Sequence, residues 1–245
     1  MFRGNWLIVA ICGAILPMAT GCGSIPQENA SSNPTNRGSL IAAHANEASD
    51  SGNSSTAVGS PPPKSVSNVI LAKTRIPGRT GQLLELVDVK GQYVDNTAIG
   101  PNQGNNWTGH FQLRVVSPTG NIQSKLSLPD NKFTQPLFTG KFQFHFADYN
   151  GDGYPDFTLG QYAGSNGNWY EIFEVNADGI AQLQTRPTAQ LFVSDFAYSP
   201  LFQQVKPDGF RIKYYDNAKP GWYQATYSWH NGTFERTSVR KASSS

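Results

Sequence analysis

Turn signals recur about every ten residues between residues 68 and 240, and the segments between them alternate apolar and polar side chains with the period of a β-strand. In the turn 117–120 (Ser-Pro-Thr-Gly), the proline fixes φ in advance at the second position. Asn231-Gly232 is the strongest short hairpin signal. Only 188–196 has some helical character, and its aromatic and β-branched residues disfavour a helix. The sequence therefore predicts an all-β domain whose antiparallel strands are joined by hairpins.

Short, evenly spaced strands are typical of sandwiches, barrels and propellers. A complete propeller requires at least about four four-stranded blades, and only one segment of this chain, residues 148–156, contains an acidic loop. We expect residues 68–240 to form a single domain of about two or three antiparallel sheets, arranged as a sandwich or as propeller blades. Residues 241–245 are expected to be a disordered tail.

One turn carries an unusual density of oxygen ligands. Residues 148–156 read Asp-Tyr-Asn-Gly-Asp-Gly-Tyr-Pro-Asp. A hard cation such as Ca²⁺ takes roughly six to eight oxygen ligands, and this alternation lets one loop supply most of them. The alternative is a polar turn whose carboxylates are only solvated. Like charges packed so closely repel each other, which favours the calcium interpretation.

The flanks of this loop read as strands, so it is not a helix-loop-helix calcium site; that motif would also place Glu where Leu159 stands. A strand, the pattern D-x-N-G-D-G-x-x-D and a second strand, over about 142–183, resemble the FG-GAP repeat of integrin-like β-propellers and the related VCBS repeats of bacterial surface proteins. The resemblance implies a Ca²⁺ site between two strands. Its implied ligands are the side chains of Asp148, Asn150, Asp152 and Asp156 and the carbonyl of Tyr154.

Residues 1–21 have the features of a secretion signal: Arg3, then the apolar run 7–16, then small residues. The run is too short to span a bilayer. The segment 19–22, Ala-Thr-Gly-Cys, resembles the bacterial lipobox, and this resemblance implies that Cys22 is diacylated. We therefore expect an exported protein anchored by lipid to the bacterial cell membrane or outer membrane. An ordinary signal peptide with an incidental cysteine is the alternative.

Residues 22–67 are rich in Ser, Asn, Pro, Ala and Gly and lack a hydrophobic period, which predicts a disordered tether. The two cysteines, Cys12 and Cys22, both precede the predicted domain, which excludes disulfides, a cysteine nucleophile and a zinc-thiolate site there. Lys and Arg number 19 against 17 Asp and Glu. This near-neutral balance, without a basic run, argues against a nucleic-acid partner.

No nucleophile elbow, metalloprotease motif or phosphate-binding loop occurs in the sequence. His110 and His145 lie in predicted strands, where an ordinary hydrogen bond is the simpler interpretation. Glu171, Glu174 and Glu235 are the acidic candidates for glycosidase chemistry, although Glu174, like Glu85, is expected to be solvated on an outer face. We therefore predict a non-catalytic protein. The alternatives are a hydrolase of envelope polymers with calcium as scaffold, and a purely structural or inhibitory module.

Large aromatic residues border several Gly/Asn-rich loops. Stacked on a sugar, such side chains serve carbohydrate-binding modules, but a domain without disulfides also needs them for its core. The candidates for ligand stacking are Trp107, Trp169 and Trp222. The expected partner is a cell-wall glycan or a surface protein.

Overall fold

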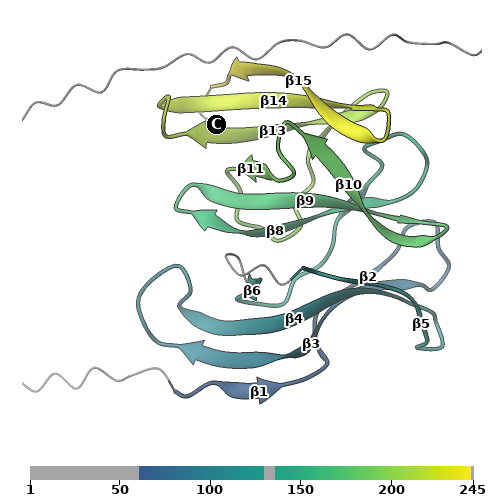
Figure 1. The fold of residues 1–245 in the computed structure, drawn as a ribbon, viewed down its shortest axis with the longest axis vertical. Helices are drawn as coiled ribbons and strands as arrows, with labels where there is room; N and C mark the ends of the chain where they lie inside the picture. Colours follow the sequence, from purple (N-terminus) through teal and green to yellow (C-terminus); the bar gives the residue numbers. More distant parts are fainter. Residues whose placement is uncertain (1–60, 130–135, 244–245) are drawn as a thin grey trace, which may run out of the picture. The chain divides into compact units, whose positions relative to one another are not determined.

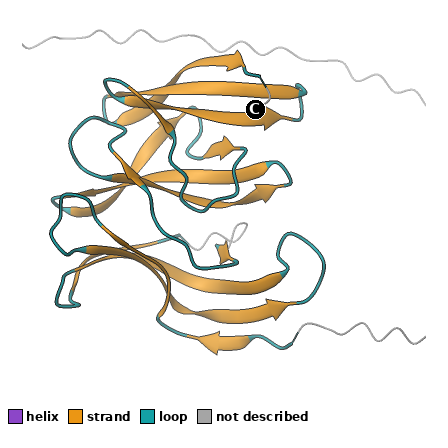
Figure 2. Ribbon diagram, turned by 180° about the vertical axis from the view of Figure 1, so that it is seen from behind, coloured by secondary structure: helices purple, strands orange, loops and turns teal. Residues whose placement is uncertain are grey.

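The computed structural model describes residues 61–129 and 136–243, all of which belong to the unit Ser55–Ser245. Every regular element in this described part is a β-strand (Figures 1 and 2), and the all-β prediction is confirmed. The predicted signal peptide, Cys22 and most of the predicted tether lie outside the described residues. No helix long and apolar enough to cross a bilayer occurs in the part of the chain that the structure covers.

The first sheet has six strands in the order β1-β3-β4-β5, with β2 also paired to β3 and β6 to β4. We call it the first layer. Its pairings are all antiparallel. β1 lies within the stretch 22–67 that the sequence assigned to the tether. The strands are β1 (Lys64–Val66), β2 (Val69–Arg75), β3 (Leu83–Asn96), β4 (Gly104–Val116), β5 (Ile122–Ser127) and β6 (Leu137–Phe138).

The second sheet has nine strands and forms two further layers, which lie above the first in Figure 1. The middle layer contains β7 (Phe146–Ala147), β8 (Asp156–Gly164), β9 (Gly167–Asn176), β10 (Gly179–Arg186) and β11 (Leu191–Val193). The third layer contains β12 (Gln203–Val205), β13 (Gly209–Asp216), β14 (Gly221–His230) and β15 (Thr233–Lys241). Strand β10 joins the two layers, because it pairs antiparallel with β9 and, further along, parallel with β15.

Each layer contains one four-stranded antiparallel meander of the kind found in a propeller blade: β2 to β5, β7 to β10 and β12 to β15. The predicted turns join them. Gly120 donates its N–H to the Ser117 carbonyl at 3.0 Å in the β4–β5 turn. Asn231 and Gly232, between β14 and β15, have φ of 47° and 80°, as a tight primed turn requires.

The short helix considered for 188–196 does not form. This segment contains β11, which pairs antiparallel with residues 168–170 in the first half of β9. Leu191 and Val193 are buried, and the β-branched and aromatic residues suit a strand better than a helix. Local propensity was therefore ambiguous, and packing against the middle layer selected the strand.

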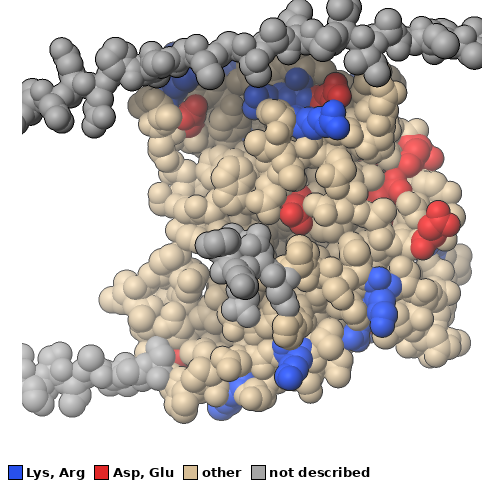
Figure 3. Space-filling view, viewed as in Figure 1, with Lys and Arg blue, Asp and Glu red and all other residues tan. Residues whose placement is uncertain are grey.

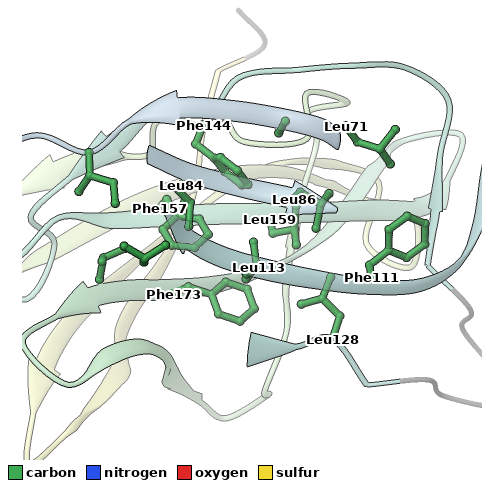
Figure 4. Close-up of a cluster of buried hydrophobic side chains, with 14 of the residues drawn as sticks. Leu71, Leu84, Leu86, Phe111, Leu113, Leu128, Phe144, Phe157, Leu159 and Phe173 are labelled. Carbon is green, nitrogen blue, oxygen red and sulfur yellow. The ribbon is translucent and has the colours of Figure 1, made fainter. Parts of the chain in front are cut away.

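A hydrophobic core fills the space between the first and middle layers (Figure 4). Leucines of β3 and β4 meet phenylalanines of β8 and β9 across this interface. The ring centroids of Phe157 and Phe173 lie 5.5 Å apart and nearly parallel, and Phe144 packs edge-on to Phe157 at 5.0 Å. The main members are Leu71, Leu84, Leu86, Phe111, Leu113, Phe138, Phe144, Phe157, Leu159, Phe173 and Val175.

A second core fills the space between the middle and third layers. Phe210 is its centre, stacked on Tyr227 at 5.1 Å and edge-on to Phe234 at 4.9 Å. The middle layer is therefore covered on both faces. The main members of this core are Tyr149, Tyr170, Ile172, Leu183, Leu191, Phe202, Phe210, Ile212, Ala225, Tyr227 and Phe234.

The outward faces of the first and third layers are polar. On the first layer, Lys73 Nζ pairs with Glu85 Oε1 at 2.9 Å. Glu85 is itself buried, which corrects the expectation that it is solvated, and the ion pair compensates its charge. On the third layer, the Arg240 guanidinium donates to Gln224 Oε1 at 2.7 Å. The stack of three blade-like layers therefore ends in solvated faces rather than in apolar ones that a further blade would cover.

Asp88 is a charged residue that does not lie on an outward face. It lies on the core side of the first layer, at a β-bulge in β3. It is fully buried, and neither carboxylate oxygen has a hydrogen-bond partner. A Cβ placed on Gly91 would lie 2.3 Å from Asp88 Oδ2, so only glycine fits beside it. Burial raises the pKa of Asp88 to about 6, although the amide of Lys90 and the charge of His110 oppose this effect. An ionised Asp88 therefore destabilises the fold.

We expect Asp88→Asn to stabilise the protein in a pH-dependent manner. Below about pH 4 the carboxyl is protonated in both the folded and unfolded states, so the charge makes no difference. Between about pH 4 and 6 the unfolded state loses this proton first, and the wild type is destabilised as the pH rises. The gain in unfolding free energy should reach on the order of 1–2 kcal/mol above pH 6, measured by urea denaturation at several pH values. A gain that is equal at pH 4 and pH 7 would contradict this explanation.

Candidate metal centre

The predicted calcium loop joins β7 to β8, and the pairs Phe146–Phe157 and Ala147–Asp156 close its base. Gly151 and Gly153 both have positive φ, 77° and 89°, which lets the chain reverse within a few residues. An added Cβ at Gly151 would meet the Pro207 carbonyl at 3.3 Å, so the loop also packs closely against the β12–β13 turn. The loop therefore lies where the middle and third layers meet.

Backbone amides orient the carboxylates at the tip of the loop. Asp148 accepts hydrogen bonds from Gly151 N at 2.7 Å and from Gly153 N at 3.0 Å. Asp152 Oδ1 accepts one from Tyr154 N at 2.9 Å. These hydrogen bonds fix the orientation of the two carboxylates relative to the turn.

In Figure 3, acidic side chains gather along one side of the middle layer, while basic side chains lie mainly over the first and third layers.

Asp156 is the most deeply placed of the predicted ligands. It is fully buried; its Oδ2 accepts a hydrogen bond from Tyr149 N at 2.7 Å, and its Oδ1 has no partner at all. Burial, together with the charges of Glu174, Asp152 and Asp148, raises the pKa of Asp156 to about 8, although the hydrogen bond from the Tyr149 amide opposes this rise. A carboxylate in this setting lacks a neutralising group.

Glu174 is a member of the site that the sequence did not identify. It stands directly opposite Asp156 in the β8–β9 pairing, and only 5% of it is exposed. Its Oε2 accepts a hydrogen bond from Asn150 Nδ2 at 2.9 Å, and its Oε1 accepts one from Asn176 at 2.7 Å. Burial also raises the pKa of Glu174. The expectation that Glu174 is solvated was wrong, because the third layer covers the face on which it lies.

Asn150 bridges the two groups of acids. Its Nδ2 donates one hydrogen bond to Glu174 Oε2 and another to Asp152 Oδ2, each at 2.9 Å. A single amide group therefore lies between two carboxylates. Tyr154 is partly exposed at the rim of the loop. Among the described residues, no three His, Cys, Asp or Glu side chains already stand in a metal-holding arrangement. The predicted set relies in addition on an amide oxygen and a main-chain carbonyl, from Asn150 and Tyr154.

The three tryptophans predicted to stack on a ligand are not brought together. Trp107 packs against the first core and against Tyr93, with ring centroids 5.1 Å apart. Trp222 lies on the outward face of the third layer, beneath Lys213 Nζ at 5.0 Å from its ring. Trp169, on β9, is 41% exposed. A common sugar-binding platform of all three is therefore excluded.

The acid–base candidates are dispersed as well. His145 Nδ1 lies 2.7 Å from the Ser199 carbonyl, an ordinary structural hydrogen bond. His110 lies on β4 near Asp88. Glu171 on β9 accepts a hydrogen bond from Gln190 at 3.2 Å, and burial raises its pKa. Glu235 pairs across β14–β15 with Ser228. These positions belong to different parts of the three layers.

No protein family, curated protein or solved structure matches this chain.

We expect Glu174→Gln to weaken calcium binding by roughly tenfold or more, because it removes one of the charges nearest to the predicted ion. Glu171→Gln, three residues earlier on the same strand, is the matched control and should leave the affinity unchanged, since Glu171 contacts Gln190 and not the loop. Calorimetric titration with Ca²⁺ measures both variants. An equal effect of the two substitutions would exclude Glu174 from the site.

Proposed function

We propose that this protein is an exported, lipid-anchored and non-catalytic binding protein whose β domain holds a structural Ca²⁺ ion in the loop 148–156. The observation that carries the calcium proposal is Asp156 Oδ1, a buried carboxylate oxygen without a partner. Native structures rarely leave such a group unsatisfied. A calcium ion takes carboxylate oxygens from several residues at once, and its charge compensates a cluster of acids.

The register of the middle layer supports the same conclusion. Asp156 and Glu174 face each other across β8 and β9, and like charges at directly opposed positions destabilise a sheet. Protonation relieves this repulsion in the absence of metal, consistent with the raised pKa values of both carboxyls. A divalent cation relieves it without a proton. The acids come from two strands and one loop, so the proposed ion would hold three chain segments together.

The Asn150 amide supports the fit as well. In the structure its NH₂ group lies between Asp152 and Glu174 and supplies the positive end of a dipole. A half-turn of the amide exchanges Nδ2 for Oδ1 and presents an oxygen ligand instead. The residues Asp148, Asn150, Asp152, Asp156 and Glu174, with the Tyr154 carbonyl, would then hold the ion.

The contacts of the loop support a structural role for the ion. The Tyr149 hydroxyl accepts a hydrogen bond from Phe202 N at 2.9 Å, and Gln204 Nε2 donates to the Asp148 carbonyl at 2.7 Å. Phe202 directly precedes β12, and Gln204 lies within β12, so both belong to the start of the third layer. An ion that fixes the loop would therefore strengthen the attachment of the third layer to the middle one.

We expect Asp156→Asn to have opposite effects with and without calcium. Asparagine keeps the acceptor for Tyr149 N but removes the buried charge, so the melting temperature in chelator should stay equal or rise. In millimolar Ca²⁺ the wild type should gain several degrees, whereas the variant should gain none, because its ligand charge is lost. Thermal melts of both proteins with Ca²⁺ and with chelator give the four values. A variant that calcium stabilises as much as the wild type would refute the site.

The proposed surface location rests on the sequence, through the signal-like residues 1–21 and the lipobox-like segment ending at Cys22. The segment between Cys22 and β1 would act as a spacer that holds the domain away from the membrane. A glycan or a protein at the cell surface is the proposed partner.

We expect Cys22→Ser to abolish incorporation of labelled palmitate and to move the protein from the membrane fraction to the soluble exported fraction, because the acylated thiol is removed. Cys12→Ser is the control and should keep both the label and the membrane location, since Cys12 lies within the predicted signal. Labelling of both variants in a bacterial host is the measurement. Palmitate label that persists in the Cys22 variant, or that is absent from the wild type, would contradict the lipid anchor.

A further inference from the structure

A groove of about 440 Å³ lies between β11, at the edge of the middle layer, and the far end of β13 in the third layer. Its size is within the range of roughly 300–1,000 Å³ typical of small-ligand sites. Trp169 and Phe192 line it from the middle layer, and Tyr214 and Tyr215 line it from β13. All these residues, like the rest of its lining, belong to the described part of the chain.

The middle-layer wall of the groove is an exposed aromatic surface. Trp169 and Phe192 are cross-strand neighbours on β9 and β11, and their rings meet edge to face at 5.3 Å. This contact holds the indole in place while 41% of Trp169 remains exposed. A fixed, exposed indole offers a flat apolar face at little cost in conformational entropy. The C–H face of a sugar ring is a ligand surface of matching shape and polarity.

Arg236 supplies a positive charge at the groove. It pairs with Tyr227 across β14 and β15, and its charge lies close enough to Tyr214 and Tyr227 to oppose the rise that burial causes in their pKa. Within residues 61–129 and 136–243, the single ion pair joins Lys73 and Glu85, so Arg236 has no carboxylate partner there. A guanidinium has five N–H donors, and those at this groove lack an anionic acceptor.

Asp216 is the acid in the lining of the groove, and backbone amides already hold one of its oxygens. Asp216 Oδ1 accepts hydrogen bonds from the backbone amides of Ala218 at 2.8 Å and Lys219 at 3.2 Å, which fix the β13–β14 turn. The groove therefore combines an exposed aromatic wall with a guanidinium that forms no ion pair among the described residues. This combination favours a ligand that has an apolar ring face and a carboxylate.

We propose that this groove binds a carboxylate-bearing sugar unit of an acidic polysaccharide, with the sugar ring stacked on Trp169 and its carboxylate held by Arg236. Tyr214, which lines the groove, offers a phenol hydroxyl for a hydrogen bond to a sugar hydroxyl group. This inference deepens the proposed binding function, on which it rests, by naming the site and the ligand class. It is independent of the calcium proposal, because none of these residues belongs to the loop 148–156.

The test uses the full chain in mild detergent with three probes: short oligomers of galacturonate, mannuronate and glucuronate. Calorimetry and tryptophan fluorescence should detect saturable binding of at least one of them. The methyl ester of that oligomer should bind roughly tenfold more weakly, because it cannot form a charge-assisted bond with Arg236.

Two groove variants and one control separate the contributions. Trp169→Ala should reduce the affinity for acid and ester alike by roughly tenfold, because both stack on the indole. Arg236→Gln should weaken only binding of the acid, so that acid and ester bind equally. Phe196→Ala, an exposed aromatic residue that lines a different cavity, should bind as the wild type does.

Binding of none of the three oligomers would overturn the proposal, as would binding that both groove variants retain. Preferential binding of a proline-rich peptide in the same groove would also overturn it and indicate a protein partner instead. Calcium titration of the same samples keeps the two proposals apart: normal calcium binding without sugar binding refutes the groove alone, and the converse refutes the metal site alone. Melting curves of each variant confirm that it is folded.

Discussion

The burial of the β8–β9 pair on both faces is the constraint on which the rest of this domain depends. Phe157 and Phe173 face the first layer, while Ile172 and Tyr170 face the third. A strand pair covered on both sides has consecutive buried residues instead of alternating buried and exposed ones, and residues 156–160 of β8 and 172–175 of β9 are accordingly buried without a break. Without this pair, the first and third layers would have no apolar surface between them to pack against.

The same constraint explains the acidic site. The register that places Phe157 opposite Phe173 also places Asp156 opposite Glu174, one residue further along. Two carboxylates are thus buried at the end of the middle layer by the pairing that builds the two cores. Their burial is costly unless a positive charge accompanies them. The loop 148–156 ends at this point in the chain, and Asn150 links its Asp152 to Glu174 at the same end of the sheet pair. The proposed metal ion would compensate for the buried charge that the packing of the aromatic layers imposes.

Features encoded within a few residues could be predicted from the sequence. The Asn231-Gly232 turn and the Gly residues of the loop 148–156 have the positive φ that their types suggest. Features that depend on a neighbouring layer could not be predicted. Glu174 alternates with apolar neighbours as a solvated residue would, and only the third layer shows that both faces of its strand are covered. The tryptophans are a second example, because sequence spacing does not show that Trp107 packs against the first core while Trp169 stays exposed.

The groove and the loop occupy opposite ends of one strand, and this gives the two proposals a common mechanical basis. Strand β13 begins beside the loop, where the Asp208–Gly209 end packs near Gly151, and it ends at Asp216 in the groove. The third layer contacts the middle layer through Tyr149 and Phe202 at the loop end and through Ser194, which donates to the Lys213 carbonyl at 3.1 Å, near the groove. The third layer is therefore attached to the middle layer at both ends of β13, by the loop contacts at one end and by the Ser194–Lys213 hydrogen bond at the other. The loop and the groove thus lie at the two ends of the same interlayer contact, and each can be tested by substitutions that leave the other unchanged.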